Sequence, residues 1–84
     1  MVFVEFRPRA LEELKEIDPV ISKRIVEKII WLQQNFGDLI PERLHHGLRE
    51  LYKLRIGDYR AFYSVSGSVT ITIEAVRHRR DAYK

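Results

Sequence analysis

Residues 51–63, Leu-Tyr-Lys-Leu-Arg-Ile-Gly-Asp-Tyr-Arg-Ala-Phe-Tyr, decide the fold. Residues that can be buried alternate with charged ones on both sides of Gly57-Asp58, which is the pattern of a β-hairpin with a two-residue turn. One face of the hairpin is then predicted to hold three cross-strand pairs: Ile56 with Tyr59, Leu54 with Ala61, and Tyr52 with Tyr63.

The other face of this predicted hairpin is positively charged, because Lys53 meets Phe62 and Arg55 lies directly opposite Arg60. Facing like charges destabilise an antiparallel pair, so a polyanion is the expected partner. Residues 1–42 hold six Lys and Arg against eight Asp and Glu, whereas residues 43–84 hold nine against four. This segregation favours nucleic acid as the ligand over the alternative of an ordinary solvated strand face.

Composition restricts the possible classes of protein. The 84 residues suit one domain spanning 1–84, and the absence of cysteine excludes disulfides and thiolate chemistry and fits a cytoplasmic protein. The N-terminus is too short and too soon charged for a signal peptide, and no membrane span is expected. His45 and His46 lack a matching third ligand, so we expect no metal site and no cofactor.

Helical signals precede the hairpin. A strand at residues 2–6 leads to Pro8, which opens a first helix with apolar positions Ala10, Leu11, Leu14 and Ile17. Asp18 and Pro19 are suited to the N-cap and first position of a second helix that runs to about Phe36. Its predicted buried stripe comprises Ile21, Ile25, Ile29, Leu32 and Phe36.

A connector at 38–47, with one helical turn around 41–44, is expected before strands at about 48–56, 59–65 and 69–77. A three-residue turn, Ser66-Gly67-Ser68, would align Val69, Ile71, Ile73 and Ala75 with Val65, Tyr63, Ala61 and Tyr59, and so bury the two isoleucines. The sequence therefore predicts an α+β fold, βααβββ, with an antiparallel sheet and a helical hairpin packed on one face. The open face is predicted to carry Lys53, Arg55, Arg60, Phe62, Thr72, Glu74 and Val76, with Arg60 opposite Glu74 and His78 continuing the same parity.

The sequence of these strands, with the ending Val-Arg-His-Arg-Arg-Asp-Ala-Tyr, resembles sequences of the RelE/ParE superfamily of type II toxin–antitoxin toxins. The resemblance covers nearly the whole chain. It implies one of two activities: RelE-type toxins are metal-independent ribonucleases that cut mRNA in the ribosomal A site, whereas ParE-type toxins inhibit DNA gyrase. A catalytically inactive member is a third alternative. The implied partners are a cognate antitoxin and, for a RelE-type toxin, mRNA and the ribosome.

The RelE-like resemblance implies Lys53, Arg60, Arg79 and Tyr83 as catalytic residues, although Leu51 stands where RelE proteins place a second lysine. YoeB-like toxins use a connector glutamate and a late histidine, which correspond here to Glu42 and His78. Arg60 and Arg79 suit phosphate stabilisation, and histidine, here His78, is the residue type suited to proton transfer near neutral pH. Further RNA contacts are expected from Arg55, Phe62, Arg77 and Arg80.

Overall fold

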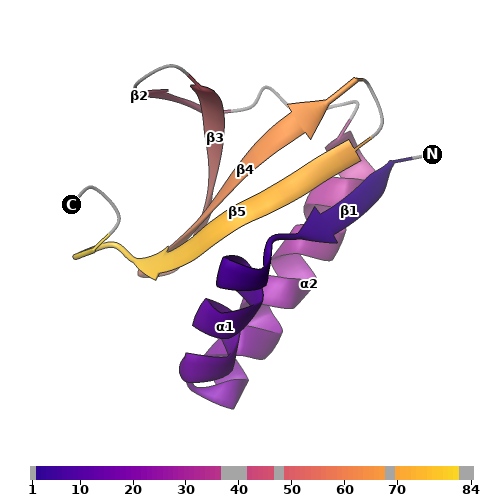
Figure 1. The fold of residues 1–84 in the computed structure, drawn as a ribbon. Coiled ribbons are helices and arrows are strands. Elements are labelled where there is room, and N and C mark those ends of the chain that lie inside the picture. Colours follow the sequence, from indigo (N-terminus) through magenta and orange to yellow (C-terminus); the bar gives the residue numbers. More distant parts are fainter. Residues whose placement is uncertain (1, 37–41, 47–48, 68–69, 82–84) are drawn as a thin grey trace.

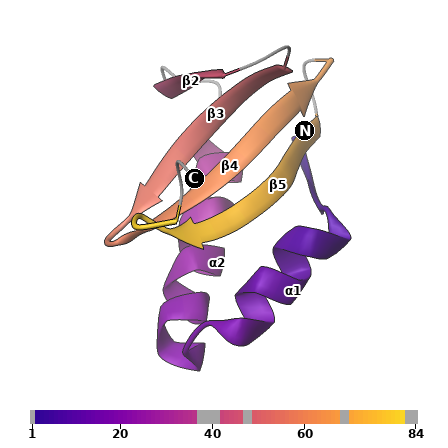
Figure 2. The same cartoon turned by 60° about the vertical axis from the view of Figure 1, so that its left-hand side comes forward.

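The computed structural model describes residues 2–36, 42–46, 49–67 and 70–81. Over these ranges, two helices, α1 (Pro8–Glu16) and α2 (Pro19–Asn35), lie on the same side of a five-stranded sheet (Figures 1 and 2). Across the sheet, the strands follow the order β1 (Phe3–Phe6), β5 (Thr70–His78), β4 (Tyr59–Ser66), β3 (Arg49–Ile56) and β2 (Glu42–His46). The predicted α+β fold is confirmed, and the sheet is antiparallel except for the parallel pair β1–β5.

Both helices begin where the sequence predicts. The Asp18 carboxylate caps α2 by accepting a hydrogen bond from the Val20 backbone N–H (N···O 2.9 Å), and Pro8 and Pro19 open α1 and α2. The predicted α2 stripe packs on the core, with three of its residues fully buried: Ile25, Ile29 and Leu32. No helix within the described ranges is both long and apolar enough to cross a membrane.

The prediction that Leu11 contributes to the core is wrong, because its side chain is 44% exposed. Helix α1 instead contributes Ala10, which is fully buried, and Leu14, which packs against the core cluster. Ala10 has a side chain small enough for the helix to approach the sheet closely. Leu11 follows it about 100° further around the helix and therefore points away from that contact.

The β3–β4 hairpin has the predicted register in every pair, from Ile56 opposite Tyr59 to Tyr52 opposite Tyr63. Gly57 in the turn has φ +56°, a left-handed conformation that glycine adopts at little cost. On the core side, the rings of Tyr52 and Tyr63 stack with centroids 5.5 Å apart. Burial, with a smaller contribution from Tyr52, raises the pKa of Tyr63 from 10.0 to about 12.

The β4–β5 register differs from the predicted one. Ile71 lies opposite Val65 and Ile73 opposite Tyr63, an offset of two residues that leaves both isoleucines on the predicted, buried face. A bulge then follows, since Ile73 pairs with Tyr63 but Ala75 pairs with Phe62. Glu74 is therefore the additional residue of β5 at this point.

The bulge exchanges the two faces of β5 beyond Glu74, because one additional residue reverses the parity of side chains along a strand. Val76 lies opposite Ala61 and enters the core at 2% exposure. Ala75 lies opposite Phe62 on the other face. The predicted placement of Ala75 in the core and Val76 on the open face is therefore wrong.

The connector prediction is also wrong over its described part. Residues 42–46 form the edge strand β2, antiparallel to β3, in place of a helical turn. Without β2, the edge of β3 would present unpaired backbone N–H and C=O groups. Pairing with the connector satisfies these groups in both segments. The register places Glu42 opposite Lys53.

Candidate functional site

The bulge aligns three arginines across the sheet. Arg55 on β3 lies opposite Arg60 on β4, and Arg60 lies opposite Arg77 on β5. We refer to these three residues as the arginine row. The sequence prediction that Arg60 faces Glu74 is wrong, because the two-residue offset of the β4–β5 register and the additional bulge residue together place Arg60 opposite Arg77, three residues further along β5.

Two members of the arginine row are bound by neighbouring groups. Arg60 Nη1 donates to the backbone oxygens of Gly57 and Tyr59, each at 2.9 Å. Arg77 Nε donates to a carboxylate oxygen of Glu13 on α1 at 3.1 Å. These contacts draw two guanidinium groups toward different acceptors and so reduce the repulsion expected between directly opposed cations.

Glu74 is bound some distance along the sheet from Arg60. Its carboxylate accepts a hydrogen bond from Ser64 Oγ at 2.7 Å and one from Arg7 Nε at 3.3 Å. It therefore helps to attach the bulge to β4 and to the segment that follows β1.

Arg79 reaches the β3–β4 turn from the C-terminal end of β5. Its backbone N–H donates to the Asp58 backbone oxygen at 2.7 Å, and its Nε lies 3.8 Å from Asp58 Oδ1. Arg60 contacts the same turn through the Gly57 oxygen. We refer to Arg60, Arg79 and the turn residues Gly57 and Asp58 as the turn cluster. Arg79 and Asp58 have side chains 64% and 68% exposed, so this ion pair leaves the Arg79 guanidinium accessible to a ligand.

A second cross-strand row contains the predicted Lys53. The backbone register aligns Glu42, Lys53, Phe62 and Ala75 on β2, β3, β4 and β5. Phe62 is only 5% exposed, although it lies outside the core cluster, so it does not offer an open ring for base stacking. The proximity of Glu42 to Lys53 depends on β2, which sequence reasoning missed.

His78 lies on a different face from Lys53 and Arg60. It is opposite Tyr59, whose side chain packs against the core, and the two rings meet edge to face with centroids 5.2 Å apart. The predicted parity of His78 is wrong because the bulge reverses it. His78 Nδ1 accepts a hydrogen bond from the Arg80 backbone N–H at 3.1 Å.

Arg80 and Tyr83 are the remaining predicted site residues. Arg80 is exposed in the turn after β5, and Tyr83 lies outside the described residues. Sequence reasoning did not single out Glu13 or Asp58, which bind Arg77 and Arg79. Glu13 sits beside Glu12 in the middle of α1, where acidic residues are common on an exposed helix surface, so the sequence contained no separate signal for its contact with β5.

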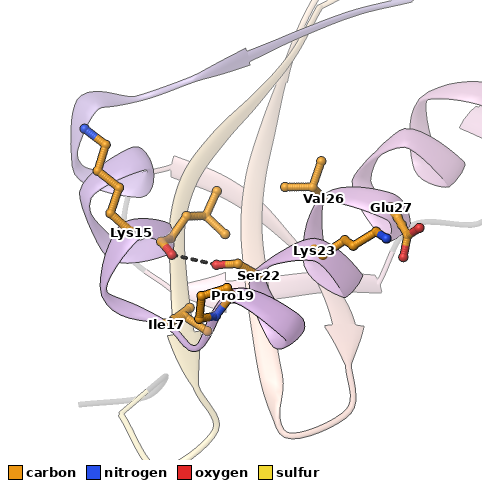
Figure 3. A pocket seen from close by; sticks show the side chains of 8 residues that line it. Lys15, Ile17, Pro19, Ser22, Lys23, Val26 and Glu27 are labelled. Atoms are coloured by element: carbon orange, nitrogen blue, oxygen red, sulfur yellow. Dashed lines mark hydrogen bonds between the residues drawn. The ribbon is translucent and has the colours of Figure 1, made fainter.

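A separate apolar groove of about 470 Å³ lies between α1 and α2 near the turn that joins them (Figure 3). Ser22 Oγ donates to the Leu14 backbone oxygen at 2.6 Å within it. Its lining combines apolar residues with charged residues: Leu14, Lys15, Ile17, Pro19, Ser22, Lys23, Val26 and Glu27. The groove shares no residue with the arginine row or the turn cluster.

Comparison with known proteins identifies the family. Residues 4–83 match the family described as the ParE toxin of the type II toxin–antitoxin system, parDE. The chain therefore belongs to this family, and the predicted membership of the RelE/ParE superfamily is confirmed. A comparison with curated proteins finds no match.

Solved structures of similar proteins come from bacteria and archaea. The RelBE2 toxin–antitoxin complex of Mycobacterium tuberculosis is 26% identical, with 93% of this chain and 98% of that chain covered and a TM-score of 0.80. The RelB–RelE complex of Methanococcus jannaschii is 30% identical, with 94% of each chain covered and a TM-score of 0.71. Isolated E. coli RelE, at 21% identity, 93% and 84% coverage and a TM-score of 0.74, shares the fold.

Proposed function

We propose that this toxin is a metal-independent endoribonuclease that cleaves mRNA on the ribosome and so inhibits translation. The observation that carries the proposal is the turn cluster, in which Arg60 from β4 and Arg79 from the segment after β5 converge on one two-residue turn. A planar guanidinium can bind two phosphate oxygens, and two such groups suit a phosphate that gains charge during cleavage. Lys53 and Arg55 on the neighbouring strand supply further positive charge.

RNA cleavage without a metal proceeds by attack of the 2′-oxygen on the adjacent phosphorus, with departure of the 5′-oxygen. A base must accept the 2′-hydroxyl proton, and the leaving 5′-oxygen must gain a proton, which water supplies in the mechanism proposed here. We assign Arg60 and Arg79 to the phosphate oxygens, and Lys53 to charge stabilisation. Tyr83 is proposed to stack on a base or orient the phosphate.

Glu42 is the proposed base, because the backbone register places it opposite Lys53 and a carboxylate can accept a proton near neutral pH. His78 was the other candidate for proton transfer. It lies on the helix-facing side of the sheet with Nδ1 engaged by Arg80 N–H, so we give it no proton-transfer role in this mechanism. Arg80 and Arg55 are proposed to contact the RNA backbone.

The experiment is an in vitro translation reaction in which mRNA 5′ ends are mapped, followed by single-turnover cleavage on programmed ribosomes. Arg79→Ala is expected to slow cleavage by about 10²–10³-fold, as loss of one charge-stabilising contact commonly does. Lys15→Ala is the matched control, because Lys15 carries the same charge and is similarly exposed at 72%, but it lies on α1 and pairs with Glu12. Cleavage by a folded Arg79→Ala protein at the parental rate would contradict the proposed site.

A second candidate function is inhibition of DNA gyrase without nuclease activity. It is favoured by the ParE family match over residues 4–83, and by Leu51 at the position where RelE proteins have a lysine. A gyrase supercoiling assay run beside the translation assay separates the two candidates. A parental protein that blocks gyrase and leaves mRNA intact would replace the ribonuclease proposal.

We also propose a cognate antitoxin as partner, since several solved relatives are toxin–antitoxin complexes. Two surfaces suit it. Acidic groups can approach the turn cluster, and the apolar side of an amphipathic helix can enter the groove between α1 and α2, next to Val26 and Ile30, which are 38% and 45% exposed. Association is expected to slow as salt is raised, and rates independent of ionic strength would contradict the electrostatic part of this surface.

A further inference from the structure

β5 pairs with β4 along one edge, whereas along its other edge β1 pairs with only part of its length. The paired stretch runs from Thr70 to Ile73, and the Arg7 backbone N–H donates to the Ile73 oxygen at 3.0 Å just after β1 ends. β5 continues to His78, and among the described residues no strand pairs with that edge beyond Ile73. Helix α1 contacts β5 instead (Figure 1).

Beyond Ile73, the side chain of Glu13 on α1 binds a backbone group of β5 that a neighbouring strand could otherwise bind. Its Oε1 accepts the Val76 backbone N–H at 3.0 Å, and its Oε2 accepts Arg77 Nε at 3.1 Å. Arg9 Nε lies 3.9 Å from the same Oε2. The Glu13 and Arg77 side chains are 23% and 22% exposed, so the contact is partly shielded from water, unlike an ordinary surface ion pair.

This contact lies between the bulge and the turn cluster. Val76 follows the bulge residue Glu74 by two positions and precedes Arg79 by three, and it is itself buried at 2% exposure. The end of β5 is therefore held by β4 along one edge and by a carboxylate from α1 along the other. That segment carries Arg79 to its hydrogen bond with the Asp58 oxygen.

We propose that Glu13 is a positioning residue, which holds β5 beyond the bulge so that Arg77 is directed to α1 and Arg79 reaches the β3–β4 turn. The consequence for cleavage rests on the proposed function, whereas the placement of β5 does not. The Val76 contact distinguishes this role from simple charge pairing, because it fixes a backbone group. An uncharged acceptor of similar length should therefore retain part of the effect.

The test compares Glu13→Ala and Glu13→Gln with Glu12→Ala. Glu12 is a matched control, since it loses the same charge from the same helix but is 70% exposed and lies 3.7 Å from Lys15. Backbone amide hydrogen exchange is followed by NMR at Val76 and Arg79, with Ile71 as an internal reference in the half of β5 covered by β1. Glu13→Ala is expected to accelerate exchange at Val76 and Arg79 by about tenfold or more relative to Ile71. Glu13→Gln should have a smaller effect and Glu12→Ala none.

Equal acceleration at Val76 and Ile71 would overturn the proposal, because it would reveal a general loss of stability. Unchanged exchange at Val76 would overturn it as well. If Glu13→Ala does not fold, exchange at Val76 relative to Ile71 in Glu13→Gln tests the proposal by the same criteria. Single-turnover cleavage provides the functional readout: its maximal rate constant is expected to fall about tenfold or more, with the half-saturating concentration retained. A parental protein without cleavage would refute the ribonuclease proposal alone, and the exchange data would still decide the role of Glu13.

Discussion

Replacement of Arg60 by alanine tests the proposed site most directly, because the structure allows its cost for folding to be separated from its cost for catalysis. The variant loses two hydrogen bonds, from Nη1 to the oxygens of Gly57 and Tyr59. A net intramolecular hydrogen bond contributes about 0.5–1.5 kcal/mol, and more when one partner is charged. At this exposed turn the Gly57 oxygen can bond to water after the substitution, which lowers the cost.

A second effect acts in the opposite direction. Arg60 stands between Arg55 and Arg77 in the arginine row, so its removal relieves an opposition of like charges that costs about 0.2–1 kcal/mol per pair. The two effects together predict a free energy of unfolding lowered by about 1 kcal/mol or less. For a domain of this size, that corresponds to a fall in Tm of up to about 4–8 °C.

The expected effect of Arg60→Ala on cleavage is much larger. A group that stabilises charge only in the transition state commonly contributes about 10²–10³-fold in rate, equivalent to roughly 3–4 kcal/mol. The assay is single-turnover mRNA cleavage on programmed ribosomes, with thermal melting measured on the same preparations. Arg60→Lys keeps the positive charge but loses the planar guanidinium, so its cleavage rate should lie between those of the parental protein and Arg60→Ala. A folded Arg60→Ala protein that cuts at the parental rate would refute the reasoning.

Three further predictions concern stability. Ile73→Ala should lower the free energy of unfolding by about 2–5 kcal/mol, since Ile73 is fully buried, whereas Ile30→Ala at a 45% exposed position should cost much less; equal losses in urea titrations would contradict the core assignment. Gly57→Ala should cost about 1–2 kcal/mol through its left-handed φ alone, because no atom lies within 4 Å of the added Cβ, and an unchanged Tm would count against that conformation. Tyr63, with its folded-state pKa raised from 10.0 to about 12, contributes stability that is fully present below pH 10 and is lost as pH rises toward 12, so Tyr63→Phe should show a shallower alkaline decline in stability than the parent.

The β3–β4 hairpin and the helix starts could be predicted because their signals are local. Charged side chains alternate with ones that can be buried from Tyr52 to Ile56 and again from Tyr59 to Ala61, and a glycine at the turn suits the positive φ that the structure shows. Asp18 followed by a proline is similarly decisive for the start of α2. In these segments, local backbone preference and the pattern of burial favour the same structure.

The bulge at Glu74 could not be predicted from the sequence. Residues 70–77, Thr-Ile-Thr-Ile-Glu-Ala-Val-Arg, contain no glycine or proline to mark an irregularity. The bulge places Val76 in the core in place of Ala75, which buries more apolar surface, and the Val76 N–H is bound by Glu13. Both gains depend on tertiary contacts, so the errors for Val76 and His78 share this cause. The error for the partner of Arg60 combines the bulge with the two-residue offset of the β4–β5 register.

The candidate site was predicted only in part, for related reasons. Arg60 and Arg79 were named from the resemblance, but their convergence on one turn depends on how far β5 extends beyond the bulge. The neighbourhood of Glu42 depends on β2, whose sequence Glu-Arg-Leu-His-His has little apolar alternation. That strand forms because the edge of β3 is available for pairing, which a reading of the connector alone does not reveal.

The parallel pairing of β1 with β5 determines when this protein can finish folding during its synthesis. Strands β2 to β5 are neighbours both along the chain and across the sheet, so each can pair with the one made before it. β1 is made first but pairs with the last strand, and its core-facing residues Val4 and Phe6 remain uncovered until β5 exists. A nascent chain that stops before β5 therefore lacks both the edge that β1 needs and the segment that carries Arg79, so we expect it to be neither folded nor toxic.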